Sequence, residues 1–262
     1  MPKTLLDEIL EPGGLTVSFQ PIYRLSGEVD LELAMAEGLA RGPSHTTASD
    51  AAILFEYVRR KREEIRVDRV CIAAALEAAR ELPVELSVAL NVHSSTLERD
   101  VDFPSFLEES LSEAEISGER VLLEIVQATT SYDGHRFKRA LERLRAIGVG
   151  FAIDDFGAGC VSCLTLLEVR PEILKLDRAL VKGLHRDPMR FAIVGSIISM
   201  AGKIEAQVVA EGVDHERDLE ALRELEVDYV QGFLLARPGP AASVTSSRQR
   251  PEPRAVPVRA RP

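Results

Sequence analysis

The sequence predicts an α/β fold, a (β/α)₈ TIM-like barrel whose first strand runs antiparallel to its neighbour. Eight short apolar runs, rich in β-branched residues, occur along the chain, and helical patterns separate them from the third run onward. Strands that alternate with helices favour parallel βαβ units, and about eight of them in about 250 residues are typical of a closed barrel. The first two runs are too close in the chain for a helical crossover, which indicates a hairpin.

The expected strands are residues 17–23, 31–37, 86–92, 121–126, 149–155, 173–177, 207–211 and 229–234. Only residues 24–30 join the first two runs. A parallel crossover needs about a dozen residues or more, so these two strands form an antiparallel hairpin that turns near Ser26 and Gly27. Residues 133–148 and 215–227 have apolar side chains at helical spacing, and the former segment ends on Gly148, a common helix stop.

The domain boundaries follow from composition. Residues 1–14 form a lead-in, residues 15–238 the barrel, and residues 239–262 a tail rich in Pro, Ser and Arg without apolar periodicity. Such a tail is expected to be disordered. Its arginines could contact an acidic partner, although a solvated tail is the simpler interpretation.

Charge and composition restrict the possible partners and the expected location of the protein. The formal net charge is −10, which argues against a long nucleic acid as a partner, since surfaces that follow phosphates are basic. No apolar run is as long as a membrane span, and the N-terminus lacks the features of a secretory signal, so we expect a cytoplasmic protein. Three cysteines are too few for a disulfide framework. Cys160 and Cys163 are either a redox pair or, as we favour, two small apolar fillers.

Polar residues gather at the ends of the predicted strands. They are Glu37, Asn91, Glu124, Asp154, Asp155, Lys175, Asp177, Glu211 and Gln231. Each alone could be a helix cap or a first-turn charge. That interpretation does not explain why polar residues recur at the ends of successive strands. In a (β/α)₈ barrel these ends share the face on which active sites are built.

Asp154 and Asp155 are adjacent at the end of a strand, where neighbouring side chains point to opposite faces. Like charges this close raise each other's pKa unless a cation lies between them. Oxygen ligands without a His/Cys cluster favour Mg²⁺ or Mn²⁺ over Zn²⁺. Asp154 could bridge two such ions and Asp155 could hold the second, and a pair of ions is the usual device for in-line phosphodiester cleavage.

Eight motifs carry a resemblance to a known family. They are FQPI (19–22), EGLARGP (37–43), NVHSSTL (91–97), LEIVQ (123–127), DDFGAG (154–159), KLD (175–177), EGVD (211–214) and QGF (231–233). Their order and spacing resemble the EAL family of bacterial phosphodiesterases, which linearise cyclic di-GMP to pGpG. The resemblance covers about residues 15–238 and implies a barrel with an antiparallel first strand, a cyclic di-GMP substrate and a homodimer.

The resemblance implies a metal site with two Mg²⁺ or Mn²⁺ ions. The residues that would hold one ion are Glu37, Asn91, Glu124 and Asp154. Those that would hold the other are Asp154, Asp155 and Glu211, of which Asp155 and Glu211 would also be catalytic. A water between the ions would be the nucleophile, its pKa lowered by the metals.

The resemblance also implies how the water and the dinucleotide are held. Lys175 would position or deprotonate the water. The residues that would contact the dinucleotide or lie beside it are Gln20, Arg41, Asp177 and Gln231, with Arg41 binding phosphate.

Some residues depart from the family pattern. The signature Glu-Ala-Leu is Glu37-Gly38-Leu39, which keeps the ligand. Val126-Gln127 replaces the usual Thr-Glu, so Gln127 is expected to support the loop after Asp155 less firmly. Residues 160–163 replace an aromatic residue and serines, and His93 stands where serine is common, more as a satisfied polar neighbour than as a ligand.

Three hypotheses therefore remain. The first, which we favour because every expected ligand and the lysine are present, is a metal-dependent cyclic di-GMP phosphodiesterase of reduced activity. The second is a cyclic di-GMP receptor that binds without efficient cleavage, suggested by Gln127 and the altered loop. The third is a non-catalytic interaction module, which a lost ligand would favour.

Overall fold

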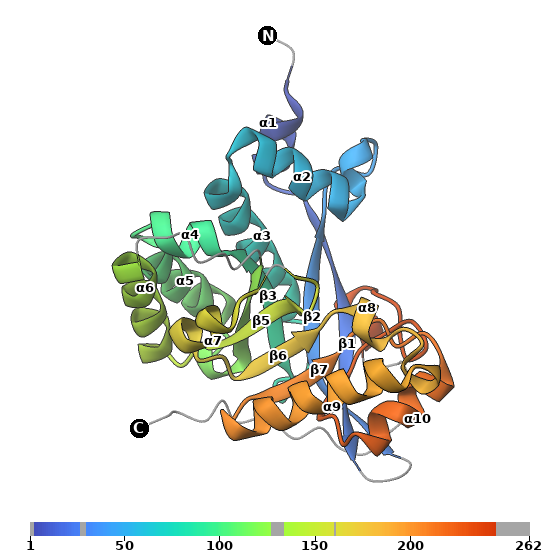
Figure 1. The fold of residues 1–262 in the computed structure, drawn as a ribbon. Coiled ribbons are helices and arrows are strands. Elements are labelled where there is room, and N and C mark those ends of the chain that lie inside the picture. The colour runs from blue at the N-terminus through green and yellow to red at the C-terminus, as the bar shows by residue number, and fades with distance from the viewer. Residues whose placement is uncertain (1–2, 27–29, 127–133, 160, 245–262) are drawn as a thin grey trace.

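The structure, a computed structural model, describes residues 3–26, 30–126, 134–159 and 161–244. Its strands form one closed barrel in the order β1 to β8 (Figure 1). They are β1 (Thr16–Ser26), β2 (Asp30–Arg41), β3 (Ser87–His93), β4 (Val121–Val126), β5 (Gly150–Phe156), β6 (Ile173–Leu176), β7 (Gln207–Ala210) and β8 (Tyr229–Val230). Each strand overlaps its predicted run, so the predicted barrel is confirmed.

The reversed first strand is also confirmed. β1 pairs antiparallel with β2 on one side and with β8 on the other, whereas the remaining neighbours are parallel. The register places Gln20 of β1 opposite Glu37 of β2. The predicted turn lies next to residues 27–29, which are outside the described residues.

Helices surround the barrel (Figure 1). They are α1 (Leu5–Leu10), α2 (Ala51–Lys61), α3 (Glu64–Ala79), α4 (Ser94–Arg99), α5 (Phe103–Ala114), α6 (Gly134–Ala146), α7 (Cys163–Val169), α8 (Arg178–Val181), α9 (Pro188–Lys203), α10 (Glu216–Glu224) and α11 (Ala241–Val244). The shorter 3₁₀ turns are η1 (Thr47–Ser49), η2 (Gly118–Arg120) and η3 (Leu184–Arg186). Helices α6 and α10 confirm the two helical segments predicted from periodicity. No helix within the described residues has both the length and the apolar character needed to cross a membrane.

The last strand is shorter than predicted. Only Tyr229 and Val230 pair in the barrel, whereas a strand was expected to continue to residue 234. The chain instead turns at Gly232, whose carbonyl accepts from the amides of Leu235 and Ala236. A Cβ at position 232 would lie 2.2 Å from the Val213 carbonyl oxygen, so this close approach requires glycine.

The folded part extends past the predicted boundary at residue 238. Gly239 exchanges two backbone hydrogen bonds with Phe19 of β1, of 2.7 and 3.0 Å. Ala241 and Val244 of α11 are buried. Residues 239–244 therefore pack against the outside of β1. They are folded, whereas a disordered tail was expected from residue 239. Residues 245–262 lie outside the described residues.

Candidate active site

The alternation of strands builds the site on one face of the barrel. Apolar residues that fill the barrel interior include Met35, Ala89, Leu122, Ala152, Ile173, Val209 and Tyr229. Two positions after each, in the same order, come Glu37, Asn91, Glu124, Asp154, Lys175, Glu211 and Gln231. Side chains two positions apart on a strand face the same way, so the polar layer lies directly above the apolar one. Because β2 to β8 run in the same direction, these polar side chains all lie at the face of the barrel formed by the carboxyl ends of the strands.

Lys175 is the centre of this layer, and its side chain is only 1% exposed. Its Nζ lies 2.6 Å from Glu211 Oε1 and 2.7 Å from Glu124 Oε2. Glu37 Oε2 and Asp154 Oδ1 follow at 3.3 and 3.4 Å. Burial alone would lower the pKa of Lys175, but the four carboxylates outweigh it and raise that pKa well above its usual value.

The carboxylates differ in how well they are satisfied. Burial would raise the pKa of Glu37, but Lys175 and hydrogen bonds from Gln231 Nε2 (2.7 Å) and Asn91 Nδ2 (3.1 Å) hold it below its usual value. Burial, reinforced by the charge of Glu37, raises the pKa of Glu124 well above its usual value. Burial also raises the pKa of Glu211 to about 8, against the opposing effect of Lys175. One ammonium therefore does not offset the burial of all four carboxyl groups, and two of them have raised pKa values.

Several oxygens of the cluster lack a donor. Among the described residues, Glu124 Oε1, Asp154 Oδ1 and Gln231 Oε1 are buried and accept no hydrogen bond. Buried acceptors without a partner are costly, and a cation is one way to satisfy them. Two oxygens without any donor, and a third whose one contact is the 3.4 Å ion pair with Lys175, fit a hard cation.

A β-bulge brings the two adjacent aspartates together. The register of β5 against β6 shifts between Ile153 and Phe156, and Asp155 has a φ of +52°, in the left-handed region that non-glycine residues seldom adopt. One carboxylate oxygen each of Asp154, Asp155 and Glu211 lies within 4.8 Å of the others. Burial, followed by the charge of Asp154, raises the pKa of Asp155 to about 6. Asp154 lines one of the two cavities beside the cluster and Asp155 the other, yet one oxygen of each still lies near Glu211.

The donor set fits a divalent metal. It consists of carboxylate and amide oxygens, the ligands that Mg²⁺ and Mn²⁺ prefer, and no cysteine within the described residues contributes to it. The structure thus brings together the residues predicted as metal ligands. They are Glu37, Asn91, Glu124, Asp154, Asp155 and Glu211.

Two cavities flank the carboxylates. One, of about 200 Å³, is lined by Gln20, Lys175, Glu211 and Gln231 among others. The other, of about 290 Å³, is lined by Arg41, Asn91 and Asp155. Glu37 lines both cavities, whereas the predicted substrate residues Gln20 and Arg41 line one each.

The remaining predicted residues are placed as follows. Asp177 caps α8 through the amide of Ala179 at 2.7 Å, and its charge contributes to the raised pKa of Asp155. Gln127, the predicted loop support, and Cys160 lie outside the described residues. His93 is buried and lines the larger cavity, and its Nδ1 lies 2.7 Å from Asp68 Oδ1, so it has a polar partner.

Sequence reasoning missed residues on the wall of the smaller cavity. Arg178, Asp214 and Phe233 line it. Phe233 is 52% exposed, and the Arg237 guanidinium lies 4.5 Å from its ring centre. The signal was present, because Phe233 belongs to the QGF motif and Arg178 directly follows KLD.

Comparisons with known proteins agree with this site. A family model described as EAL domain matches residues 3–238. An uncharacterized signaling protein of Caulobacter vibrioides is 31% identical over 248 residues, which are 92% of this chain and 30% of that protein. The cyclic di-GMP phosphodiesterase NbdA of Pseudomonas aeruginosa is 35% identical over 244 residues, which are 91% of this chain and 31% of that protein. The chain therefore spans about a third of the length of these relatives.

Solved structures show the same architecture. The manganese and cyclic di-GMP complex of Klebsiella pneumoniae BlrP1 superposes with a TM-score of 0.76 at 29% identity, covering 87% of this chain and 57% of that one. The cyclic di-GMP complex of the PaMucR phosphodiesterase superposes with a TM-score of 0.78 at 26% identity, covering 91% of this chain and 97% of that one.

Proposed function

The chain belongs to the EAL domain family, and from this premise we propose that it hydrolyses cyclic di-GMP to linear pGpG with Mg²⁺ or Mn²⁺. The observation that carries the proposal is the cluster of four carboxylates around the buried ammonium of Lys175, with unpartnered oxygens inside it. The manganese and cyclic di-GMP complex of BlrP1 supports the choice of metal and substrate. The substrate would be a bacterial second messenger, and we propose that the chain acts on it in the cytoplasm.

Each carboxylate has a proposed role. One ion would be held by Glu37, Asn91, Glu124 and Asp154. The other would be held by Asp154, Asp155 and Glu211, whose oxygens already converge. Bound divalent ions would lower the pKa of a water and offset charge on the phosphate.

Lys175 would position the attacking water, and Gln231 would orient a metal-binding carboxylate. The pKa of Lys175 is raised by the surrounding carboxylates, so the side chain is a cation at neutral pH. A cation favours positioning of the attacking water over its deprotonation. Gln231 donates to Glu37 Oε2 at 2.7 Å and so fixes the direction of that carboxylate.

The dinucleotide would lie across the two cavities. Gln20 and Phe233 line one of them, and Arg41 lines the other. The guanidinium of Arg41, whose Nη1 donates to its neighbour's carbonyl, can bind phosphate in a fixed fork geometry. Asp177, beside Asp155, would complete this rim.

The test is product analysis with purified protein, cyclic di-GMP and Mn²⁺ or Mg²⁺. Glu37→Gln and Asp154→Asn should each lower kcat by about 10²-fold or more, because a metal supplies several kcal/mol of transition-state stabilisation. Glu142→Gln, on the exposed side of α6, is the matched control and should leave turnover unchanged. Ligand variants that turn over like the wild type would contradict the assigned site.

A second candidate, a receptor that binds cyclic di-GMP with little cleavage, is favoured by one feature. Gln127 replaces an acidic residue of the family pattern, so the loop after Asp155 would lose a charged support. Nucleotide binding by the wild type without pGpG formation at saturating Mn²⁺ would select this candidate.

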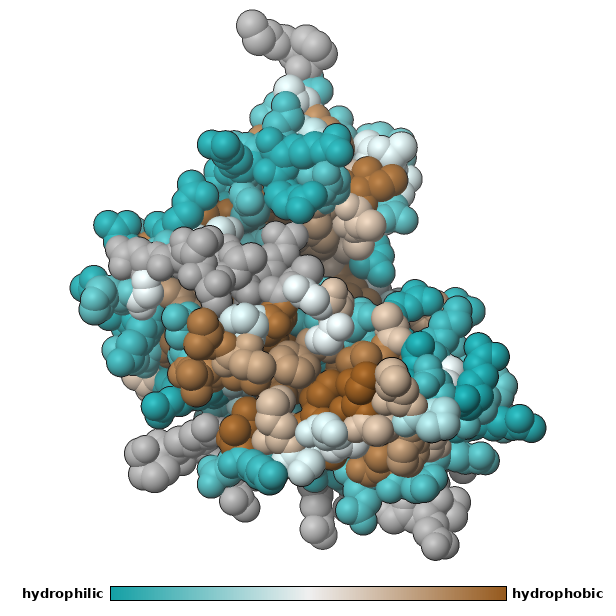
Figure 2. All heavy atoms as spheres, viewed as in Figure 1, coloured by the Kyte–Doolittle hydropathy of each residue, from teal (hydrophilic) through white to brown (hydrophobic). Residues whose placement is uncertain are grey.

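We also propose a homodimer, formed by a surface that we call the α7/α9 face. Its exposed apolar side chains include Leu164, Leu167, Met189 and Ile193, which are 61%, 71%, 75% and 45% exposed. Figure 2 shows hydrophobic residues gathered over these two helices. Apolar patches of this kind are typical of protein interfaces.

A second copy fits the α7/α9 face because of charge. Helix α9 contains just two charged residues, Arg190 and Lys203, near its two ends. The whole chain has a net charge of −10, so most of its surface repels another copy. A nearly uncharged apolar face is where two such chains can associate at least electrostatic cost.

A further inference from the structure

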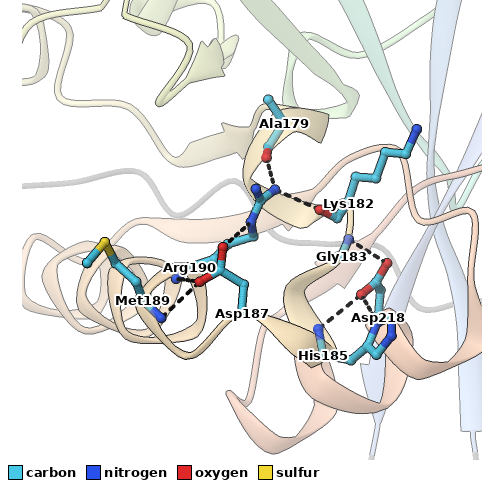
Figure 3. A network of polar contacts seen from close by, with 8 residues as sticks. All are labelled: Ala179, Lys182, Gly183, His185, Asp187, Met189, Arg190 and Asp218. Atoms are coloured by element: carbon cyan, nitrogen blue, oxygen red, sulfur yellow. Dashed lines mark hydrogen bonds and ion pairs between the residues drawn. The ribbon is translucent and has the colours of Figure 1, made fainter.

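A second buried polar network is centred on the first turn of α10 (Figure 3). Its centre is Asp218 of α10, which is 4% exposed. Asp218 Oδ2 accepts from the Gly183 amide at 3.0 Å, and Oδ1 accepts from the His185 amide at 3.1 Å. Oδ1 also lies 2.6 Å from His185 Nδ1. One carboxylate of α10 therefore holds the segment between α8 and α9.

That segment begins at the catalytic layer. β6 carries Lys175, and α8 starts directly after it with Asp177 as its cap. At the other end of α8, Arg190 of α9 donates to the carbonyls of Ala179 and Lys182, the latter at 2.7 Å (Figure 3). The path from Lys175 to the network is thus short and held by hydrogen bonds at both ends.

The partner segment carries another member of the cluster. Glu211 follows β7, and α10 begins after it with His215 as its cap, whose Nδ1 accepts from the Arg217 amide at 3.1 Å. The His215 ring stacks on the His185 ring at 5.3 Å with an angle of 15° between the planes. The segments after β6 and β7 are therefore joined by both a carboxylate and a ring pair.

The two segments also touch next to the site. Gly212 has a φ of +64°, and a Cβ added there would lie 2.5 Å from Arg178 Cβ. Such close packing transmits a shift of one segment to the other. The contact between Lys175 Nζ and Glu211 Oε1, at 2.6 Å, lies across the same two segments.

We propose that Asp218, through His185 and Gly183, is a positioning residue that fixes the segment bearing Lys175 relative to the segment bearing Glu211. The inference rests on the proposed metal-dependent function. Hydrogen bonds to a charged carboxylate are roughly twice as strong as neutral ones, so this clamp is stronger than a loop contact between neutral groups. A misplacement of about 1 Å at a reacting group can cost on the order of 10²-fold in rate.

The test compares Asp218→Ala with Asp7→Ala, a matched control at a helix cap away from the network. Asp7 Oδ2 accepts from the Thr4 amide at 3.0 Å and from Thr4 Oγ1 at 2.7 Å, and these bonds stay within the cap of α1. Mn²⁺ affinity by calorimetry and kcat and KM for cyclic di-GMP are measured on the whole 262-residue chain. Asp218→Ala should lower Mn²⁺ affinity and kcat by about 10-fold or more, within the range that misplacement causes, with KM changed much less. Asp7→Ala should keep all three.

Two further variants sharpen the test. Asp218→Asn keeps an oxygen acceptor for the two amides and should recover part of the Mn²⁺ affinity. His185→Gln, which changes a side chain that is 22% exposed, should fold even if Asp218→Ala does not, and it should weaken Mn²⁺ binding in the same direction. Equal Mn²⁺ affinity in the Asp218, His185 and Asp7 variants would overturn the proposal. If the wild type forms no pGpG, the proposed function fails, whereas the Mn²⁺ comparison still decides on the clamp.

Discussion

Replacing Lys175 by methionine removes the ammonium on which four carboxylates converge. Its contacts are 2.6–3.4 Å long, and its side chain is 1% exposed. At an effective dielectric constant of about 20, each contact represents about 5 kcal/mol of gross attraction. Repulsion among the carboxylates and the loss of hydration offset most of that sum. Breaking a buried ion pair costs about 3–5 kcal/mol in net stability.

The expected loss lies at the lower end of that range. Glu124 can take up a proton when its cation is removed, because burial already raises its pKa well above the usual value. We therefore expect Lys175→Met to lower the free energy of unfolding by about 3 kcal/mol at pH 7 without metal. Mn²⁺ should stabilise the variant more than the wild type, since a bound cation replaces the lost charge. The variant should nevertheless not turn over.

The assay is urea denaturation in EDTA and again in Mn²⁺. Lys138→Met is the matched control, because Lys138 pairs with Glu142 at 3.9 Å on the surface and is 72% exposed. An exposed pair contributes about 0–1 kcal/mol. The assigned electrostatics of the cluster are refuted if Lys175→Met is no less stable than Lys138→Met in EDTA. They are also refuted if Mn²⁺ stabilises Lys175→Met and the wild type equally.

Three more predictions follow from other parts of the chain. Gln127→Glu should raise kcat and lower the Mn²⁺ concentration that gives half-maximal activity, without changing the affinity for cyclic di-GMP. An unchanged kcat would mean that other groups support the loop. Leu164→Glu with Leu167→Glu should shift the protein from dimer to monomer in sedimentation, and a monomeric wild type would contradict the α7/α9 face. Burial would raise the pKa of Asp218, but hydrogen bonds from His185 and from backbone amides lower it below the usual value. Its contribution is therefore present above about pH 4 and lost as pH falls through the folded-state pKa, so the stability gap between wild type and Asp218→Asn should shrink below about pH 4 in urea titrations.

Much of the fold could be predicted because it depends on local pattern. The β4 strand was predicted at the residues where it is found, since six consecutive apolar or inward-facing residues between polar segments leave few alternatives. The hairpin followed from connection length alone, as seven residues cannot carry a parallel crossover. The short β8 was not predictable in the same way, because its end is fixed by contact between Gly232 and Val213 across the fold.

The site likewise has features that local sequence pattern predicts and features that depend on contacts across the fold. The spacing of acids at strand ends predicted which residues meet, because a closed barrel brings all those ends to one face. It did not predict the β-bulge at Asp154 and Asp155, since that bulge depends on how β5 pairs with β6. Nor did it give a role to Asp218, whose partners lie more than thirty positions away in the chain.

The sequence by itself determined the strands, the direction of the first one and the identity of the polar layer, since each depends on residues close in the chain. Only the tertiary structure decided the distances within that layer. Gln231 and Glu37 are separated by 194 positions, yet their side chains meet at 2.7 Å because the barrel closes between β1 and β8. Such distances are set by the pairing of all eight strands at once, and no local segment contains that information.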